Sequence, residues 1–182
     1  MATDISMSSN ALLLIGHETI NSFTDPGAGA RAASNLYQTV YEDAITSYPW
    51  RFAIGKVSLS KLTAAPLNEW KNGFQLPGDL LLTYRTYPRS TFEIYEDVLY
   101  SDQETVQIDY WFKPDETTLP PYFIKYMQYM LAAEFAISVT DNRTLAETFD
   151  AKATQQFLLA TNRDSQGRTN NAIESAPFLE CR

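Results

Sequence analysis

Residues 120–140 read PPYFIKYMQYMLAAEFAISVT, and this stretch decides the fold. Its two prolines suit a helix start, because proline at the first helical position sacrifices no needed N–H group. The sequence therefore predicts a helix over Pro121–Thr140. Apolar residues cover nearly every side of this helix: Phe123, Ile124, Tyr126, Met127, Tyr129, Met130, Leu131, Phe135 and Ile137. A helix that is apolar all round needs partners all round, so we expect it at the centre of a helical bundle or completed by a neighbouring subunit.

Two helices are predicted before this central stretch. Ser8 or Ser9 can cap a short helix that runs through Ile15, and the residues before it read as a frayed start. Asp25 can cap a longer helix that ends before Pro49, since apolar residues repeat there at spacings of three and four.

One further helix is predicted after the central stretch. Asp141 or Asn142 can cap it, and its apolar stripe ends near Ala160. The residues from Asn162 read as a polar exit from this helix.

The chain between the helices is β-like. Alternating apolar residues predict a strand over residues 50–59 with a bulge or bend at Gly55. The pair Asn72-Gly73 is a turn signal, and residues 80–84 can form another strand.

Most of the negative charge lies in one window of this β-like region. The 182 residues include 22 acidic and 14 basic side chains, which gives a formal net charge of −8. The window Thr91–Thr118 holds eight of the acids and one base, so it carries −7 of that charge. Alternation on both sides of residues 101–104 predicts a hairpin there, with the acids on its polar face and turn. A basic protein that grips phosphates is not expected from this balance.

Residue counts and motifs limit the chemistry. The single cysteine, Cys181, excludes an internal disulfide, and the single histidine, His17, nearly excludes a zinc site of Cys and His ligands. His17 is expected at a helix end in a surface or capping role. No glycine motif for phosphates or dinucleotides occurs, and no apolar run is long enough for a membrane span. We therefore expect no cofactor, no metal site, no membrane and no enzyme.

A small aromatic and basic patch is the remaining local signal. Its members follow one another closely: Tyr84, Arg85, Tyr87 and Arg89. Such patches can stack on nucleic acid, but the acidic window follows at once, so packing or a protein contact is favoured. The tryptophans are expected to be core or interface anchors: Trp50, Trp70 and Trp111.

The fold class predicted from these patterns is α+β, mainly α. Residues 1–49 would supply the N-terminal helices of the bundle and residues 114–164 its C-terminal helices. Residues 50–113 would form an inserted β-rich lobe, and residues 165–182 an extended C-terminal tail.

Five different short motifs follow one another along residues 11–165. They are Ala11–Gly16 (ALLLIG), Ile20–Asp25 (INSFTD), Tyr48–Ala53 (YPWRFA), Phe74–Asp79 (FQLPGD) and Leu131–Ala136 (LAAEFA). In this order and spacing the chain resembles the tail tubular protein A family, the head-to-tail connectors, or adaptors, of short-tailed phages.

The resemblance implies a structural virion protein that is made in the host cytoplasm. Members of the family form a twelve-fold ring that joins the portal above to a tail nozzle of the tail tubular protein B kind below. DNA passes through the ring without sequence-specific binding. The family fold, a helical bundle with an inserted β region, agrees with the pattern above.

The resemblance also suggests a role for three groups of residues. The apolar helix would pack against a neighbouring subunit through Tyr126, Met127 and Met130. The tail would dock on the portal through Pro177, Phe178 and Leu179. The acidic hairpin would face the channel or the nozzle with Glu93, Glu96, Asp97, Asp102 and Glu104.

Two alternative functions remain open from the sequence. The first is a virion-associated peptidoglycan hydrolase, which would need a desolvated carboxyl group, and Glu134 in the apolar helix is its only candidate by context. The second is a monomeric regulator that binds the portal without forming a ring.

Overall fold

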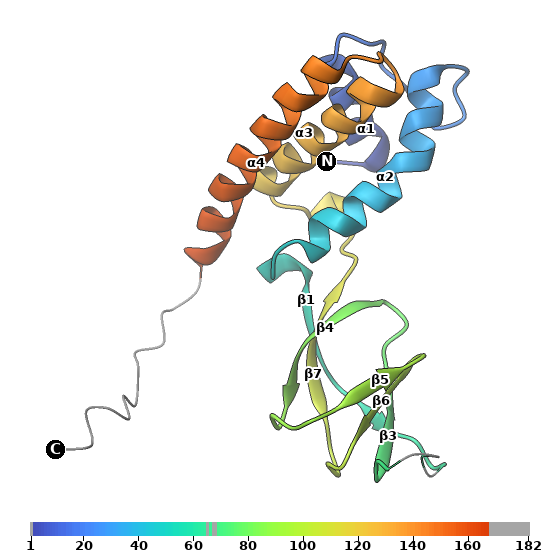
Figure 1. Ribbon diagram of the computed structural model, residues 1–182, viewed down its shortest axis with the longest axis vertical. Coiled ribbons are helices and arrows are strands. Elements are labelled where there is room, and N and C mark those ends of the chain that lie inside the picture. The colour runs from blue at the N-terminus through green and yellow to red at the C-terminus, as the bar shows by residue number, and fades with distance from the viewer. Residues whose placement is uncertain (1, 65, 67–68, 168–182) are drawn as a thin grey trace, which may run out of the picture.

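The computed structural model describes residues 2–64, 66 and 69–167. These residues form four α-helices and two antiparallel sheets, so the predicted α+β class is confirmed. The helices gather at one end of the molecule and the strands at the other (Figure 1). We call these two regions the helical part and the β lobe.

The helical part is organised around one helix. It contains α1 (Asp4–Leu14), α2 (Ala28–Thr46), α3 (Pro121–Ser138) and α4 (Arg143–Ser165). Helix α3 contacts all three of the others, and most closely α4. The helix predicted from the apolar stretch is therefore present, and its central position follows from its need for partners on several sides.

The start of α1 differs from the prediction. The helix begins at Asp4, because the Thr3 hydroxyl accepts a hydrogen bond from the backbone of Ser6 while the Ser6 hydroxyl accepts one from the backbone of Thr3. These two reciprocal bonds form a capping box. Ser8, expected to be a cap, lies buried inside the helix instead. The predicted end at Gly16 is confirmed by its left-handed backbone, φ +77°.

The start of α2 was also predicted wrongly. The helix begins at Ala28, after Gly27, and not at Asp25. The Asp25 carboxylate accepts hydrogen bonds from the backbone N–H groups of Asn21 and Ser22. It therefore closes the preceding turn, which is a second local use of an Asp side chain that sequence cannot tell from a helix cap.

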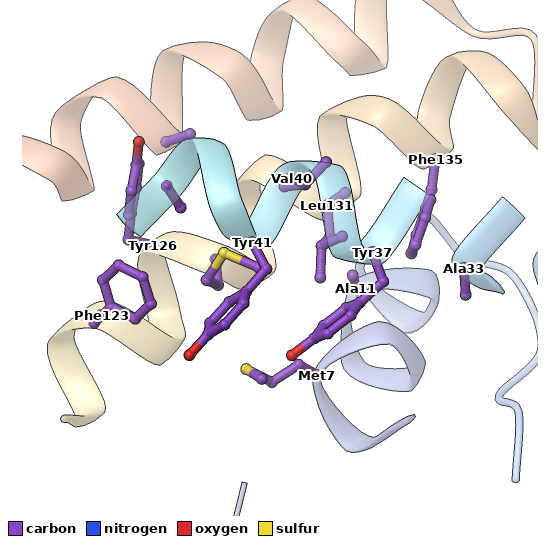
Figure 2. Close-up of a cluster of buried hydrophobic side chains, with 14 of the residues drawn as sticks. Met7, Ala11, Ala33, Tyr37, Val40, Tyr41, Phe123, Tyr126, Leu131 and Phe135 are labelled. Carbon is purple, nitrogen blue, oxygen red and sulfur yellow. The ribbon is translucent and has the colours of Figure 1, made fainter. Parts of the chain in front are cut away.

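Aromatic side chains fill the core between α2 and α3. Figure 2 shows Tyr37 and Tyr41 of α2 lying toward Met7 of α1, with side chains of α3 beside them. The Tyr41 hydroxyl donates to the carbonyl of Pro114 at 2.8 Å, which ties α2 to the segment that leads into α3.

The first sheet of the β lobe has three strands in the order β1-β7-β4, namely β1 (Ile54–Ser58), β7 (Gln107–Phe112) and β4 (Leu80–Tyr87). Gly55 lies within β1 opposite Tyr110 in an unbroken register, so the bulge that was one of the two alternatives there does not occur. A Cβ atom at Gly55 would lie 2.8 Å from the Tyr110 ring. Glycine at this position therefore allows the Tyr110 ring to pack closely against the backbone of β1.

The second sheet has four strands in the order β2-β3-β6-β5. They are β2 (Ser60–Lys61), β3 (Asn72–Gln75), β6 (Val98–Ser101) and β5 (Glu93–Tyr95). The Asn-Gly pair expected to make a turn starts β3 and pairs with β6. Its turn propensity is overridden by the strand pairing on either side.

The hairpin in the acidic window is not the one predicted. Strands β5 and β6 form it, with Glu96 at its turn in the left-handed region, φ 53°. The segment expected to be the turn, residues 101–104, instead leads from the second sheet to the first, because β6 and β7 belong to different sheets. Alternation had identified the strands but not their partners.

Two short 3₁₀ helices mark the crossings between the helical part and the β lobe. The first, η1 (Arg51–Ala53), leads from α2 into β1, and the second, η2 (Glu116–Thr118), leads from β7 toward α3. The strand predicted to begin at Trp50 therefore begins at Ile54. Trp50 is fully buried in the helical core, and its indole N–H donates to the Ala44 carbonyl at 2.8 Å.

Candidate interaction surfaces

The described residues hold no group of three or more His, Cys, Asp or Glu side chains that would suit a metal ion. None of the helices in this part of the chain is both long enough and apolar enough to cross a membrane. Of the residues singled out from the sequence, some lie on surfaces of the helical part and the β lobe and others are buried.

The three residues predicted for a subunit interface have different environments. Met127 is fully buried in the core of its own chain, and Tyr126 is nearly so. Met130 is only half-buried and lines a surface groove. Of the three, Met130 alone keeps substantial surface for a neighbour, whereas a charge at Met127 would disturb folding itself.

The groove at Met130 lies between α2, α3 and α4, and we call it the acidic groove. Its floor is apolar and its rim carries three exposed carboxylates, one from each helix. The floor is formed by Leu36, Val40, Met130 and Ala133, and the rim by Asp43, Glu134 and Asp150. The exposed Ile137 follows Met130 by seven residues, or about two turns, and so continues the same side of α3.

A second apolar groove lies on the other side of α3, and we call it the lysine groove. It runs from α1 across α3 to α4, as two adjoining hollows that share Lys125 and Tyr129. Its apolar lining includes Leu13, Leu14, Ile124, Tyr129 and Leu159, and its charged side chains are Lys125 and Lys152.

Helical geometry places these two grooves back to back. Lys125 and Glu134 are nine residues apart on α3, which is about 2.5 turns and therefore opposite sides. Asp150 and Lys152 are two residues apart on α4, or about 200° around its axis. Both helices thus present carboxylates to one face and ammonium groups to the other.

The five carboxylates predicted for a channel or nozzle face are all exposed. They lie on or next to the second sheet: Glu93, Glu96, Asp97, Asp102 and Glu104. Glu104 accepts a hydrogen bond from Lys61 at 2.8 Å, which lowers the pKa of its carboxyl group. Glu93 accepts one from the Trp70 indole at 3.0 Å. The structure therefore brings these side chains together on one lobe, with local partners for some of them.

Asp109 is the member of the acidic window that does not face water. It is buried on β7, 3.8 Å from the Lys56 ammonium group, and accepts a long hydrogen bond from the Tyr87 hydroxyl at 3.4 Å. The expectation that all the acids lie on a solvated face is wrong at this position. Asp109 lies on the central strand of the first sheet, where its cross-strand neighbours are Lys56 of β1 and Arg85 of β4.

A basic cleft surrounds this buried carboxylate. The structure adds Arg51 and Lys56 to the aromatic and basic patch that the sequence indicated around Arg85. The Arg85 guanidinium lies 4.6 Å from the centre of the Tyr84 ring and donates to its hydroxyl. The sequence did not reveal this cleft, because β1 and β4 are far apart along the chain and meet only through β7.

Two residues that bear on enzymatic alternatives lie at the surface or have ordinary partners. Glu134 is exposed on the rim of the acidic groove, so it does not supply the desolvated carboxyl group that the hydrolase alternative would need. The ring of His17 is half-buried, and its Nδ1 lies 3.2 Å from the Glu18 carbonyl oxygen.

The end of α4 is anchored to the rest of the chain. Asp164 is buried and accepts hydrogen bonds from the Tyr122 hydroxyl at 2.8 Å and from the backbone N–H of Arg51 at 3.2 Å. Burial, and next the bond to Asp164, raise the pKa of Tyr122. The helix reaches Ser165, so the polar exit predicted from Asn162 begins too early. The three residues predicted to dock on the portal lie outside the described residues: Pro177, Phe178 and Leu179.

The surfaces with a shape or charge suited to contact are thus the acidic groove, the lysine groove, the basic cleft and the acidic β lobe. Each is assembled from residues that are distant in sequence. Compared with models of known protein families and with curated proteins, the chain matches none of them.

Proposed function

We propose that this chain is a structural virion protein, one copy of a dodecameric ring that joins the portal to the tail nozzle of a short-tailed phage. The helical part would be the bundle that forms the body of the ring, and DNA would pass through its channel without sequence-specific binding. The residues that follow α4, up to residue 182, would form the extended tail that reaches the portal. The ordered sequence motifs that resemble the tail tubular protein A family support this proposal, together with the arrangement of the surfaces.

One observation carries the proposal: the central helix α3 has an open apolar groove on each of two opposite sides. Exposed apolar surface of this kind is typical of protein contacts. Two such faces on opposite sides of one chain suit a molecule with a neighbour on each side, which is the geometry of a ring.

The acidic β lobe has two possible roles in such a ring. In the channel, its carboxylates would repel the phosphates of passing DNA and keep the strands from adhering. On the edge of the ring, they would meet a basic surface of the nozzle and fix its orientation. Both roles use the concentration of exposed carboxylates on the second sheet.

Charge reversal separates these roles from each other. We expect the triple variant Glu93→Lys, Glu96→Lys and Asp97→Lys to remain folded, since all three side chains are exposed. If the lobe faces the channel, particles with this variant should assemble with the nozzle but release their DNA poorly. If it faces the nozzle, co-sedimentation with the nozzle protein should be lost.

A matched control places lysines outside the lobe. Glu18→Lys with Thr19→Lys also adds positive charge at exposed positions of the helical part, which line neither groove. This variant should keep both nozzle binding and DNA release. If the triple variant retained both nozzle binding and DNA release, neither of the two proposed roles of the lobe would hold.

Two further experiments test the alternative functions. A hydrolase would clear a peptidoglycan suspension and lose that activity in Glu134→Gln, whereas we expect no clearing from either protein. A monomeric regulator would bind the portal as single copies at every protein concentration. Sedimentation of the portal complex distinguishes single copies from a ring by mass.

A further inference from the structure

The two grooves of the helical part carry opposite charge, and this suggests what fills them. We infer that the lysine groove of one copy binds the acidic groove of the next, as the two halves of a single head-to-tail contact. The inference rests on the proposed ring and deepens it, because it assigns the surfaces through which neighbouring subunits meet.

The charges of the two faces are complementary. Among the described residues lining the lysine groove, the charged side chains are Lys125 and Lys152, and none is a carboxylate. The lining of the acidic groove, in the same part of the chain, holds three carboxylates and no cation. A nearby cation, Arg143, is drawn toward Glu147 on its own helix at 3.8 Å. Opposed potentials of this kind select the partner and its register.

Exposed apolar side chains on both grooves favour the association of two copies. On the lysine side, Leu13 is 56% exposed, Leu14 42% and Leu159 49%. On the acidic side, Ile137 is 57% exposed, about two turns along α3 from the half-buried Met130. Burial of apolar surface against a second copy contributes roughly 25 cal/mol for each Å² removed from water, so both faces gain from contact.

The lysines are held in place before any contact forms. The Lys125 ammonium lies 5.7 Å from the centre of the Tyr129 ring, and that of Lys152 lies 4.6 Å from the Phe149 ring. A cation resting on an aromatic face has fewer conformations to lose on binding. The rim of the lysine groove is therefore partly ordered for opposing carboxylates.

The arrangement also disfavours a symmetric dimer. A two-fold contact would place each groove against its own copy, lysine against lysine or carboxylate against carboxylate, and like charges brought together repel. Because the grooves lie on opposite sides of α3 and α4, the favoured contact is heterologous. Each copy then has one free face, which the next copy fills until the rotation closes a ring.

Two reciprocal charge reversals test this contact. The first variant carries Lys125→Glu and Lys152→Glu, so both of its faces are acidic. The second carries Glu134→Lys and Asp150→Lys, so its acidic face becomes basic and resembles the other. All four side chains are exposed, and circular dichroism should show both variants folded.

Sedimentation velocity over a range of protein concentrations gives the readout. Alone, each variant should self-associate on the order of 100-fold more weakly than the unaltered chain. Mixed in equal amounts, the two should assemble again, because every contact between unlike variants joins an acidic face to a basic one. The control Arg31→Glu with Glu18→Lys changes exposed charges at positions that line neither groove and should assemble normally.

The opposing outcomes separate this contact from the ring itself. Variants that assemble alone as well as the unaltered chain would overturn the groove contact and leave the proposed ring intact. Variants that stay apart when mixed would also overturn it, because each groove would then serve another partner. An unaltered chain that remains monomeric, alone and on the portal, would overturn the ring and the contact together.

Discussion

At the residue scale, Trp50 joins the two parts of the molecule. Its ring lies 5.2 Å from that of Phe123 and 5.0 Å from that of Tyr48, centre to centre, and its N–H is bonded inside the core. The next residues leave the helical part through η1 and enter β1. Trp50 therefore anchors the first of the two crossings between the parts.

Truncation of this side chain should be costly. We expect Trp50→Ala to lower the free energy of unfolding by about 3–5 kcal/mol, because it removes a fully buried aromatic ring and leaves a cavity. Urea unfolding followed by circular dichroism measures the change. Leu158→Ala, at a position that is 63% exposed, is the control and should change it by less than about 0.5 kcal/mol. Equal effects of the two substitutions would contradict the role given to Trp50.

At the element scale, the ends of the helices explain which boundaries were predictable. Asn142 caps α4, as expected, through a bond from the Leu145 N–H to its side chain at 3.0 Å. The cap of α1 at Thr3 was missed, because a serine takes the place usually held by Glu or Gln. A cap formed by a residue type that commonly caps helices could be predicted. A cap in which a less usual residue takes part could not.

Gly16 closes α1 with a backbone that other residues resist. The N–H of His17 bonds to the Leu12 carbonyl and that of Gly16 to the Leu13 carbonyl, a Schellman arrangement that needs a left-handed residue. Gly16→Ala should therefore lower the free energy of unfolding by about 1 kcal/mol, measured by urea unfolding.

Gly78 provides the comparison for that measurement. A Cβ atom there meets nothing within 4 Å, and its backbone is outside the left-handed region. Gly78→Ala should leave stability within about 0.5 kcal/mol of the unaltered chain. If the two glycine substitutions cost the same, conformational strain at Gly16 is not what ends the helix.

The strands show the limit of prediction from local pattern. Alternation after residue 104 predicted the second strand of a hairpin, and β7 occupies Gln107–Phe112. Pairing depends on segments that are distant in sequence, so the hairpin partner of that strand was predicted wrongly. The burial of Asp109 follows from the same pairing, since β7 is the central strand of its sheet.

At the scale of the whole molecule, the surfaces could be predicted only in part. The acidic lobe was visible in the sequence because its carboxylates are close together along the chain. The two grooves were not, since each combines side chains from three helices whose packing no local pattern specifies. The apolar circumference of α3 did indicate that this helix has contacts beyond its own chain.

The central claim concerns where this chain lies in a virus particle. Electron microscopy of purified tailed particles, with reconstruction of the head-to-tail junction, tests it most directly. We expect a closed twelve-fold ring between portal and nozzle, with density that fits the helical part and places neighbouring copies against opposite sides of α3. Particles that lack this chain, or that hold it anywhere other than in a ring at the junction, would contradict the proposal.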